Sequence, residues 1–383
     1  MHAGYGLFHE DHHAFRRTVR RFVESEITPH VKAWEDAEEF PRSLFQRCGA
    51  LGFFGLRAPV SLGGTAAGPL FEAVLHEELG RCGSGGVAAG LAGHVAIALP
   101  PILLFGNEAQ QQRWVPRAIA GEIVGALAIT EPEAGSDVAG IRTRCVRDGD
   151  ELVIDGAKTY ITNGVRADFV VVAVKSEPEA GAGGISMVVV ERGTAGFSVG
   201  RKLRKLGWHA SDTAELVFEG CRVPAANLLG SWNEGFSCIL ANFVWERLAL
   251  ALGAVAQGEL ALEKALAYAR ERRAFGRPVA SFQVTRHKLA DMALRLEAAR
   301  QLTYHGLRLY EGGEDAVAVA AMAKRLATEN ALSICDDALQ IHGGAGYMRE
   351  YEVERYFRDA RLGPIGGGTS EIMNEIVARQ LGL

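Results

Sequence analysis

The spacing of apolar side chains changes twice along this chain, and this change limits the possible folds more than any other feature. In residues 10–120 and again in residues 236–383, apolar positions recur every three to four residues, the period of a helix that packs one face against a core. Between them, residues 121–235 hold short β-branched runs bounded by glycine-rich turns. We therefore expect an α+β multidomain protein with three successive domains.

The expected domains are an N-terminal all-α domain over residues 1–120, a middle domain over 121–235 and a C-terminal domain over 236–383. We expect the middle domain to be antiparallel, a β-barrel or sandwich-like domain. The C-terminal domain is expected to be a four-helix bundle, because short loops join the first three of its long helical stretches. Those stretches are Phe236–Arg270, Phe282–Glu311, Asp315–His342 and Ser370–Leu381.

Composition argues against several functional classes. Lys and Arg number 41 against 46 Asp and Glu, a net charge of −5 without any long basic run, which is not typical of a nucleic-acid-binding protein. The 6 cysteines are far apart and form no C-x-x-C pair, so we expect neither a disulfide framework nor a metal site, and a reducing compartment.

Two stretches bear on targeting and membranes. Residues 1–15 carry acids and histidines where a signal peptide would carry an apolar stretch. The most apolar run, Gly83–Gly106, contains His94 and the pair Pro100–Pro101, which makes it a poor membrane span. We expect a cytoplasmic protein without a membrane span.

One pair of charged residues stands out in the first helical stretch of the C-terminal zone. Between Glu234 and Glu259 the only charged residues are Glu246 and Arg247, and their neighbours at helical spacing are nearly all apolar. Burying a charge costs several kcal/mol unless the charge is paired or used. Glu246 is therefore either half of an internal salt bridge or a carboxylate whose pKa is raised by a dry pocket, so that it can act as a base.

Four other motifs carry polar chemistry, although each alone could be an ordinary loop or strand. They are the turn Ala128–Asp137, the strand Lys158–Gly164, the glycine loop Ile365–Ile372 and the basic turn Arg272–Pro278 followed by Phe282–Gln283. The glycine loop enters a helix capped by Thr369 or Ser370, and free backbone N–H groups at such a junction suit an anion or a carbonyl.

Together these motifs resemble the acyl-CoA dehydrogenase family of FAD flavoproteins from one end of the chain to the other. The segments that carry the resemblance are Phe40–Arg42, Glu77–Arg81, Thr130–Asp137, Tyr160–Gly164, Leu206–Leu216, Arg222–Pro224, Arg272–Gly276, Gln340–Gly344 and Gly368–Ile372. The resemblance implies a helical, a β and a helical domain in that order, FAD as cofactor, and a homotetramer built as a dimer of dimers.

The resemblance also assigns cofactor residues. It places Leu127, Ile129, Thr130 and Ser136 along the flavin, with Ser136 also touching the substrate. It implies that Tyr160 packs against the flavin ring and that Thr162 forms a hydrogen bond with the cofactor. It also implies that Thr369 and Glu371 bind the FAD. A second set is expected to reach the FAD of the dimer mate: Arg272, Phe275, Gln283, Gln340, Gly343 and Gly344.

The position of the catalytic base in this sequence differs from the commonest pattern of the family. Many members carry a Glu directly before the Gly-Thr-Ser of the C-terminal loop, but this chain has Gly367 there. A smaller subgroup, which includes isovaleryl-CoA and long-chain acyl-CoA dehydrogenases, places the base on the first helix of the bundle. The matching position is Glu246, the acid singled out above by charge spacing alone.

The implied reaction is the α,β-dehydrogenation of a saturated acyl-CoA to its trans-2-enoyl-CoA. Glu246 would abstract the α-proton, flavin N5 would accept the β-hydride, and the Gly367 N–H would bind the thioester oxygen. Arg247 would contact CoA, and electrons would pass to an electron-transferring flavoprotein. Three rivals stay open: a dehydrogenase of an acyl-carrier-protein thioester, a related flavin oxidase, and a non-catalytic flavin or acyl-CoA binding protein.

Overall fold

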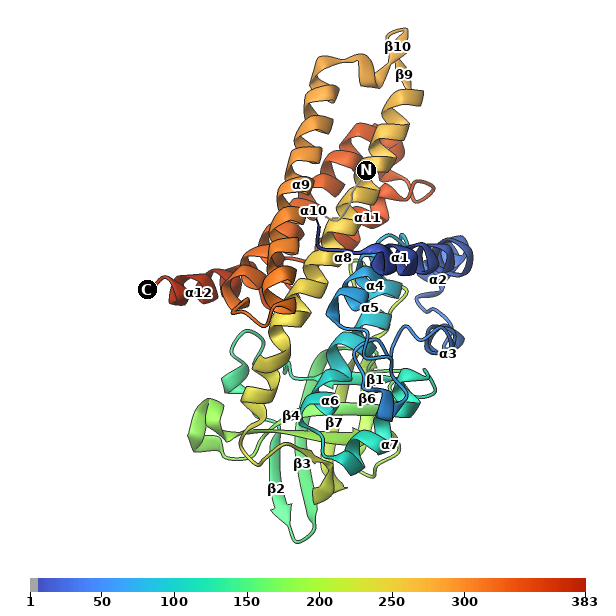
Figure 1. Ribbon diagram of the computed structural model, residues 1–383. Helices are drawn as coiled ribbons and strands as arrows, with labels where there is room; N and C mark the ends of the chain where they lie inside the picture. Colours follow the sequence, from blue (N-terminus) through green and yellow to red (C-terminus); the bar gives the residue numbers. More distant parts are fainter. Residues whose placement is uncertain (1–5) are drawn as a thin grey trace.

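A computed structural model describes residues 6–383, so the first five residues of the segment considered above for a signal peptide lie outside the described part. The three zones predicted from apolar spacing are present in the expected order, and Figure 1 shows the sheet at one end of the molecule and the long C-terminal helices rising from it. This confirms the predicted fold class.

Seven α-helices lie in the described part of the N-terminal zone, from residue 6 on. They are α1 (Glu10–Phe22), α2 (Val31–Ala37), α3 (Ser43–Ala50), α4 (Pro69–Gly80), α5 (Gly85–Ala92), α6 (Pro100–Phe105) and α7 (Glu108–Ile119). Local chemistry sets several of their ends: Pro69 opens α4, the Ser84 hydroxyl accepts the Val87 N–H at the start of α5, and Asn107 forms a capping box at α7. Helix α4 is buried along almost its whole length between α1 and the first bundle helix.

Eight strands form the sheet of the middle zone. They are β1 (Gly125–Ala128), β2 (Arg144–Asp148), β3 (Glu151–Thr162), β4 (Phe169–Lys175), β5 (Ile185–Glu191), β6 (Phe197–Lys202), β7 (Thr213–Pro224) and β8 (Leu228–Leu229). The spatial order is β6-β7-β3-β2-β4-β5-β8, with β1 also paired to β4. Strand β4 is buried on both faces: Phe169 and Val171 face the core shared with the N-terminal helices, and Val170 and Val172 face the other side.

The sheet differs from the expectation in one respect, because it is mixed rather than wholly antiparallel. Strand β1 pairs parallel with β4, in the register Gly125 to Phe169. Parallel neighbours need a long connection. The segment between them, which includes the β2–β3 hairpin, provides it.

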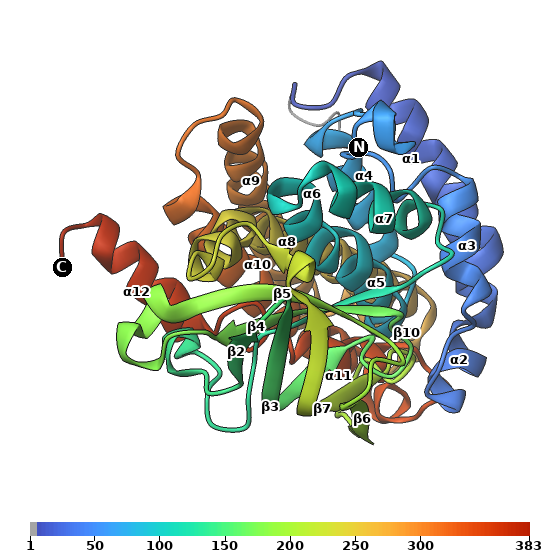
Figure 2. The same cartoon turned by 90° about the horizontal axis from the view of Figure 1, so that it is seen from below.

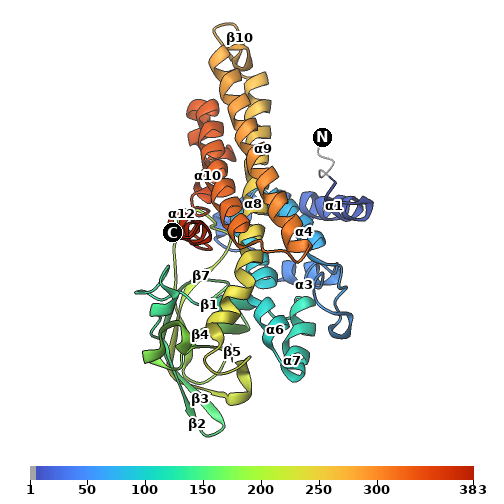
Figure 3. The ribbon, with the colours of Figure 1, turned by 60° about the vertical axis from the view of Figure 1, so that its left-hand side comes forward.

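The C-terminal zone contains three long helices side by side, α8 (Gly235–Glu271), α9 (Gln283–Glu311) and α10 (Val317–His342). The short strands β9 (Arg273–Ala274) and β10 (Arg277–Pro278) lie in the turn between α8 and α9, at the end far from the sheet (Figure 3). The stretch expected as the fourth bundle helix is α12 (Ser370–Gln380), which starts against α10 and then leaves the three long helices (Figure 2). A short helix that we did not predict, α11 (Val353–Ala360), packs against α8 and α10.

Two helical segments, Gly85–Phe105 and Gly235–Glu271, are long and apolar enough to cross a membrane by length and composition. In their most apolar windows, 67% and 61% of the residues are buried inside the protein, as expected for helices of a folded core. Their apolar character is therefore explained by packing against the sheet and the neighbouring helices.

Candidate active site

Glu246 lies on the buried face of α8, where only 8% of the residue is exposed. Among the residues that the structure describes, it forms no salt bridge. Its only hydrogen bond there comes from Asn242, one turn earlier on α8, whose Nδ2 lies 2.7 Å from Glu246 Oε1. Burial raises the pKa of Glu246 to about 7, opposed by the Asn242 hydrogen bond and by the charge of Arg247. This carboxyl group can exchange a proton near neutral pH.

The Asn242 amide also donates a hydrogen bond to a backbone carbonyl that has no helical N–H partner, because prolines follow it. Asn242 Nδ2 donates to the Ala96 oxygen over 2.9 Å. Residues 93–98 form a π-helical turn, and the Pro100–Pro101 pair that follows has no N–H groups to bond the preceding carbonyls. The sequence therefore creates an acceptor at Ala96, and that acceptor orients the amide that binds Glu246.

Gly367 lies in the loop between α11 and α12 and has a φ of +65°. A Cβ atom on Gly367 would overlap Leu250 Cδ1, one turn after Glu246 on α8. Position 367 can therefore hold a side chain only if Leu250 moves. This gives a structural reason for the glycine and places the loop beside the turn of α8 that follows Glu246.

Lys324 of α10 forms a hydrogen bond with this loop. Its side chain is fully buried, and Nζ donates to the Gly368 carbonyl oxygen over 2.5 Å. Burial, with a smaller contribution from the charge of Arg247, lowers the pKa of Lys324 to about 8, whereas Glu329 and Glu371 oppose the shift. Two buried cations thus lie near the glycine loop.

Arg247 is the second of these cations. Its guanidinium lies over the Phe243 ring, 5.0 Å from the centroid, and burial lowers its pKa. Nε of Arg247 is buried and has no hydrogen-bond partner among the described residues. An unpaired buried donor of this kind is uncommon in a native protein. It marks a place where a polar ligand can bind.

At the end of strand β3, Tyr160 has an unusual backbone conformation. Its φ is +59°, the pairing of β3 with β7 shifts between Lys158 and Ile161, and the tyrosine is 69% exposed. A bulge of this kind turns a side chain out of the strand alternation. Tyr160 and Thr162 are both more exposed than Ile161 between them. The result is an exposed aromatic ring beside a hydroxyl.

The turn after β1 is hydrogen-bonded to this part of β3. The Thr159 N–H donates to the Thr130 carbonyl over 2.9 Å, and Lys158 Nζ donates to the Ile129 carbonyl and to Glu131 Oε1. Burial lowers the pKa of Lys158 to about 8, and Glu131 opposes this shift. The predicted flavin residues Leu127, Ile129, Thr130 and Ser136 all belong to this strand and turn, with Ser136 fully at the surface.

The contacts connect the sheet to the base. A Cβ at Gly93 would lie 3.4 Å from Thr162 Cγ2, so the π-helical turn of residues 93–98 touches the end of β3 on one side. On its other side, that turn bonds Asn242 through Ala96. The structure therefore brings the predicted residues of the sheet, Glu246 and the glycine loop into one region.

A second group of predicted cofactor residues lies far from that region in the single chain. Arg272, Phe275 and Gln283 sit in or next to the α8–α9 turn, at the opposite end of the bundle from the sheet (Figure 1), and Phe275 is 95% exposed. Gln340, Gly343 and Gly344 are exposed at the end of α10, next to His342, whose ring stacks on Tyr268 near the same end of α8. These two sets are not brought together with Tyr160 within one chain.

The remaining predicted cofactor residues begin α12. Thr369 caps this helix, its side chain accepting the Ile372 N–H over 3.3 Å, and Glu371 is exposed in the first turn. They follow directly on the loop that holds Gly367 and Gly368.

Comparison with known proteins identifies the family. Three family models cover nearly the whole chain: the N-terminal domain of acyl-CoA dehydrogenase over residues 9–122, the middle domain over 126–221 and the C-terminal domain over 233–382. The chain belongs to the acyl-CoA dehydrogenase family.

Individual members of the family match over most of their length. An acyl-CoA dehydrogenase of Bacillus subtilis is 41% identical over 366 residues, 96% of each chain. The long-chain specific mitochondrial enzyme of Sus scrofa is 40% identical over 98% of this chain and 87% of its own. The crystal structure of the Geobacillus kaustophilus acyl-CoA dehydrogenase is 41% identical, covers 100% of both chains and superposes with a TM-score of 0.95.

Members of the acyl-CoA dehydrogenase family are FAD-dependent oxidoreductases. The residues of this chain fit such a cofactor. An exposed tyrosine ring held at a strained φ offers a stacking surface, and a partly exposed polar turn lies beside it.

Sequence reasoning missed three residues of the candidate site. Asn242, Leu250 and Lys324 each act through a contact with a distant segment, Ala96, Gly367 and Gly368 respectively. Only Lys324 carried a usable signal, as a charge on a helix whose neighbouring positions are mostly alanines.

Proposed function

We propose that this acyl-CoA dehydrogenase family member converts a saturated acyl-CoA into its trans-2-enoyl-CoA, with Glu246 as the base that removes the α-proton. The observation that supports this most strongly is the environment of Glu246. It is a buried carboxyl group without a salt bridge, with its pKa raised to about 7, and with one oxygen held by Asn242. A base poised near the working pH is what removal of a weakly acidic proton requires.

The glycine loop supplies a hydrogen-bond donor that complements the base. As the α-proton leaves, negative charge develops on the thioester oxygen, and the Gly367 N–H is proposed to bind that oxygen. Lys324 holds the next carbonyl, at Gly368, so the peptide groups of the loop keep one orientation. Arg247, whose buried Nε is unpaired, is proposed to bind a polar group of CoA, and Ser136 to contact the substrate from the turn after β1.

FAD is proposed to be held by Tyr160, Thr162, Thr369, Glu371 and the turn that contains Ile129 and Thr130. When bound, FAD supplies the oxidising capacity that takes up the β-hydrogen with its bonding electrons. The protein orients the substrate and excludes water from Glu246.

A second copy of the chain is proposed to complete each site. Strand β3, which carries Tyr160, lies at one end of the chain, and the α8–α9 turn lies at the other (Figure 1). Arg272, Phe275, Gln283, Gln340, Gly343 and Gly344 are therefore proposed to reach the FAD of a neighbouring subunit. A homotetramer built from such dimers, with electrons passed to an electron-transferring flavoprotein, completes the proposal. We place the protein in the cytoplasm, supported by 6 cysteines that are all buried and unpaired.

The test is an anaerobic titration of the purified holoenzyme with straight and branched saturated acyl-CoAs, following the absorption band of oxidised flavin. We expect wild type to bleach and Glu246→Gln to keep its colour. The matched control is Glu314→Gln, which removes an exposed acid from the α9–α10 loop. Bleaching of Glu246→Gln at the wild-type rate would show that Glu246 is not the base.

One comparison favours a second candidate. The solved structure of a prolyl acyl carrier protein oxidase is 32% identical, covers 98% of this chain and superposes with a TM-score of 0.94. A carrier-protein thioester, or oxygen as electron acceptor, is therefore the alternative. Bleaching by acyl-carrier-protein thioesters but not by acyl-CoAs, or fast re-oxidation in air, would support it. Persistent colour with every thioester would instead indicate a binding protein.

A further inference from the structure

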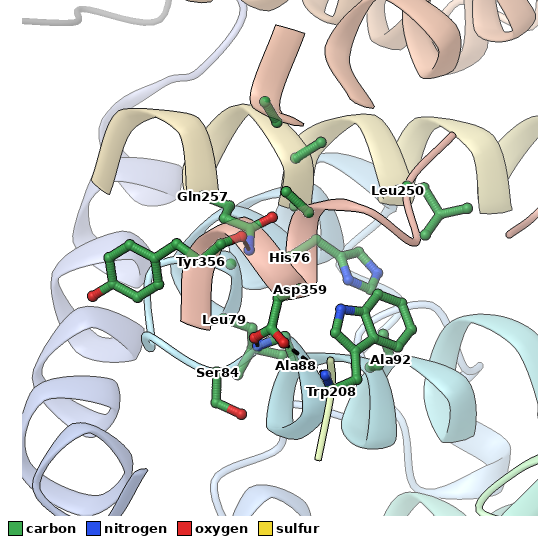
Figure 4. Close-up of a pocket in the computed structure, with 18 of the residues that line it drawn as sticks. His76, Leu79, Ser84, Ala88, Ala92, Trp208, Leu250, Gln257, Tyr356 and Asp359 are labelled. Atoms are coloured by element: carbon green, nitrogen blue, oxygen red, sulfur yellow. Dashed lines mark hydrogen bonds between the residues drawn. The ribbon is translucent and has the colours of Figure 1, made fainter. Parts of the chain in front are cut away.

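Buried charged side chains in the described chain make contacts of at least two kinds. Figure 4 shows the first kind beside a cavity of the helical part: the Asp359 carboxylate accepts the N–H groups of Trp208 and Gly85, and so joins segments far apart in the sequence. The second kind is an ion pair between Lys158 and Glu131, whose side chains are 0% and 3% exposed. Because the desolvation of two charges offsets much of their attraction, a buried ion pair is weak evidence for stability alone. The position of this pair points to another role.

The ion pair lies between the two segments that are proposed to contact the flavin. Lys158 Nζ donates to the Ile129 carbonyl oxygen over 2.9 Å and to Glu131 Oε1 over 2.7 Å. The next residue along β3 donates its N–H to the Thr130 carbonyl, and Tyr160 follows at the bulge. Lys158 is therefore bonded to the turn after β1 and comes two residues before the exposed tyrosine ring.

The Glu131 carboxylate closes the loop of residues 131–143. Its Oε2 accepts the Arg142 N–H over 2.6 Å, and its Oε1 accepts the Thr143 N–H over 2.8 Å, so one side chain joins both ends of the loop. The negative charge is thus shared among two backbone donors and Lys158. The ammonium group, in contrast, has the Ile129 carbonyl as its other printed partner, so its positive charge acts on the turn after β1.

A fixed positive charge at this turn has a consequence for a bound flavin. Reduction adds two electrons to FAD, and a preorganised cation in a site without water stabilises the electron-rich form. For two unit charges about 10 Å apart at an effective dielectric constant of about 20, Coulomb's law gives a factor of more than ten in an equilibrium constant. The effect of one buried lysine is therefore large enough to measure.

We propose that Lys158 is a positioning residue for FAD, which orients the turn at Ile129 and Thr130 and favours the reduced over the oxidised cofactor. The inference rests on the proposed function in one respect, because that function places the flavin against this turn and Tyr160. It depends neither on the identity of the thioester substrate nor on the catalytic base.

The experiment is the midpoint potential of FAD bound to the holoenzyme, measured against a reference dye during slow reduction without any thioester. In Lys158→Gln the amide can still donate a hydrogen bond, but the positive charge is gone and Glu131 stays negative. We expect the equilibrium ratio of reduced to oxidised FAD to fall at least tenfold, roughly 30 mV for a two-electron couple. Lys175→Gln should stay within twofold of wild type.

Lys175 is the matched control because it is another buried lysine of the same sheet, 7% exposed. Its Nζ donates to the Ala139 and Gly181 carbonyl oxygens, each over 2.7 Å. It lies three residues past Val172, the partner of Ala128 at the end of β1, which is about 10 Å further along β4. Its loss should lower stability, measured by urea unfolding, without changing the charge at the turn after β1.

A second variant guards against misfolding, because Lys158→Gln leaves a buried carboxylate without its cation. The double variant Lys158→Gln with Glu131→Gln removes both charges, and we expect its ratio of reduced to oxidised FAD to fall at least threefold. A folded variant that releases FAD when Lys175→Gln retains it would also support the orienting role.

Three outcomes would overturn the inference. The first is a ratio within twofold of wild type in either Lys158 variant. The second is an equal fall in Lys175→Gln. The third is failure of both Lys158 variants to fold, which would assign Lys158 a purely structural role.

Failure of the proposed function gives a different result. Since the potential is measured without a thioester, a protein that oxidises no acyl-CoA still reports on Lys158. The proposed position of FAD is tested separately by Tyr160→Leu, which should shift the absorption band of the bound flavin. A shifted band in Tyr160→Leu with an unchanged potential in Lys158→Gln overturns the role of Lys158 alone. No change in either variant overturns the proposed position of FAD as well.

Discussion

The Asn242 side chain donates a hydrogen bond of 2.7 Å to the carboxylate of Glu246, one turn later on the same helix. The same amide nitrogen also bonds the Ala96 carbonyl, 2.9 Å away on a different helix. One short side chain therefore fixes the proposed base relative to the N-terminal domain, and it opposes the rise in the pKa of Glu246 that burial causes.

Substituting the proposed base should separate catalysis from folding. We expect Glu246→Gln to lose at least a thousandfold in the rate of flavin reduction, because Gln has no proton-accepting carboxylate, while FAD remains bound. Stopped-flow reduction with excess substrate measures the rate. Glu314→Gln should match wild type, and a loss of less than tenfold in Glu246→Gln would contradict the assignment.

The raised pKa of Glu246 predicts two opposite pH dependences. Since the base acts when deprotonated, kcat/KM should increase with pH through about 7. Stability should change the other way: the unfolded carboxyl group loses its proton near 4.5 but the folded one near 7, so the free energy of unfolding of the apoprotein falls between these pH values.

The size of that stability effect can be measured with the same variant. The loss amounts to about 3 kcal/mol at pH 8, from about 1.4 kcal/mol per unit of pKa. Glu246→Gln should therefore be more stable than wild type at pH 8 and nearly equal to it at pH 4.5. Urea unfolding at the two pH values measures this, and equal stability differences at both would contradict the raised pKa.

Removing Asn242 should move the pH profile rather than abolish activity. In Asn242→Ala the pKa of Glu246 rises further, so activity at pH 7 falls several-fold and recovers at higher pH. The Ala96 carbonyl also loses its partner, which should cost about 1–3 kcal/mol of stability. Asn330→Ala is a control with a similar lost bond to a backbone carbonyl, at Arg295, and its pH profile should stay unchanged.

Lys324 is expected to act on the glycine loop rather than on overall stability. Lys324→Met removes the bond to the Gly368 carbonyl but also a buried charge, so stability should change by less than about 1 kcal/mol. We expect kcat/KM to fall about ten- to a hundredfold, the worth of one charge-assisted hydrogen bond. Lys264→Met, which breaks a surface ion pair with Glu352, is the control. An equal effect in both variants would assign Lys324 a purely structural role.

Gly367 should tolerate a side chain only when Leu250 is shortened. Gly367→Ala combines a positive φ with a clash against Leu250, whereas Gly313→Ala has the same kind of φ, +70°, and no atom within 4 Å. We expect Gly367→Ala to be less stable than Gly313→Ala by about 1–3 kcal/mol, the usual cost of overpacking. The added change Leu250→Ala should remove the part of that difference due to the clash, and a double-mutant cycle by thermal unfolding measures the coupling.

The sequence was sufficient for the order of the three zones, and it singled out the acid at Glu246 as a candidate base. Both are recorded locally, in the period of apolar residues and in the shortage of charges around positions 246 and 247. It did not predict that β1 pairs parallel with β4, or that α12 leaves the bundle, because both depend on how distant segments meet.

In the candidate site, too, some features follow from the local sequence and others depend on contacts between distant segments. The sequence by itself determined which residues are candidates for the chemistry: a lone acid in an apolar helix and a run of glycines before a helix cap. Tertiary structure alone decided what those residues do to one another. Burial raises the pKa of Glu246, Leu250 occupies the space a side chain at position 367 would need, and Lys324 reaches Gly368, 44 residues away. Desolvation and steric exclusion arise from neighbours far apart in the chain, so no local pattern of residues records them.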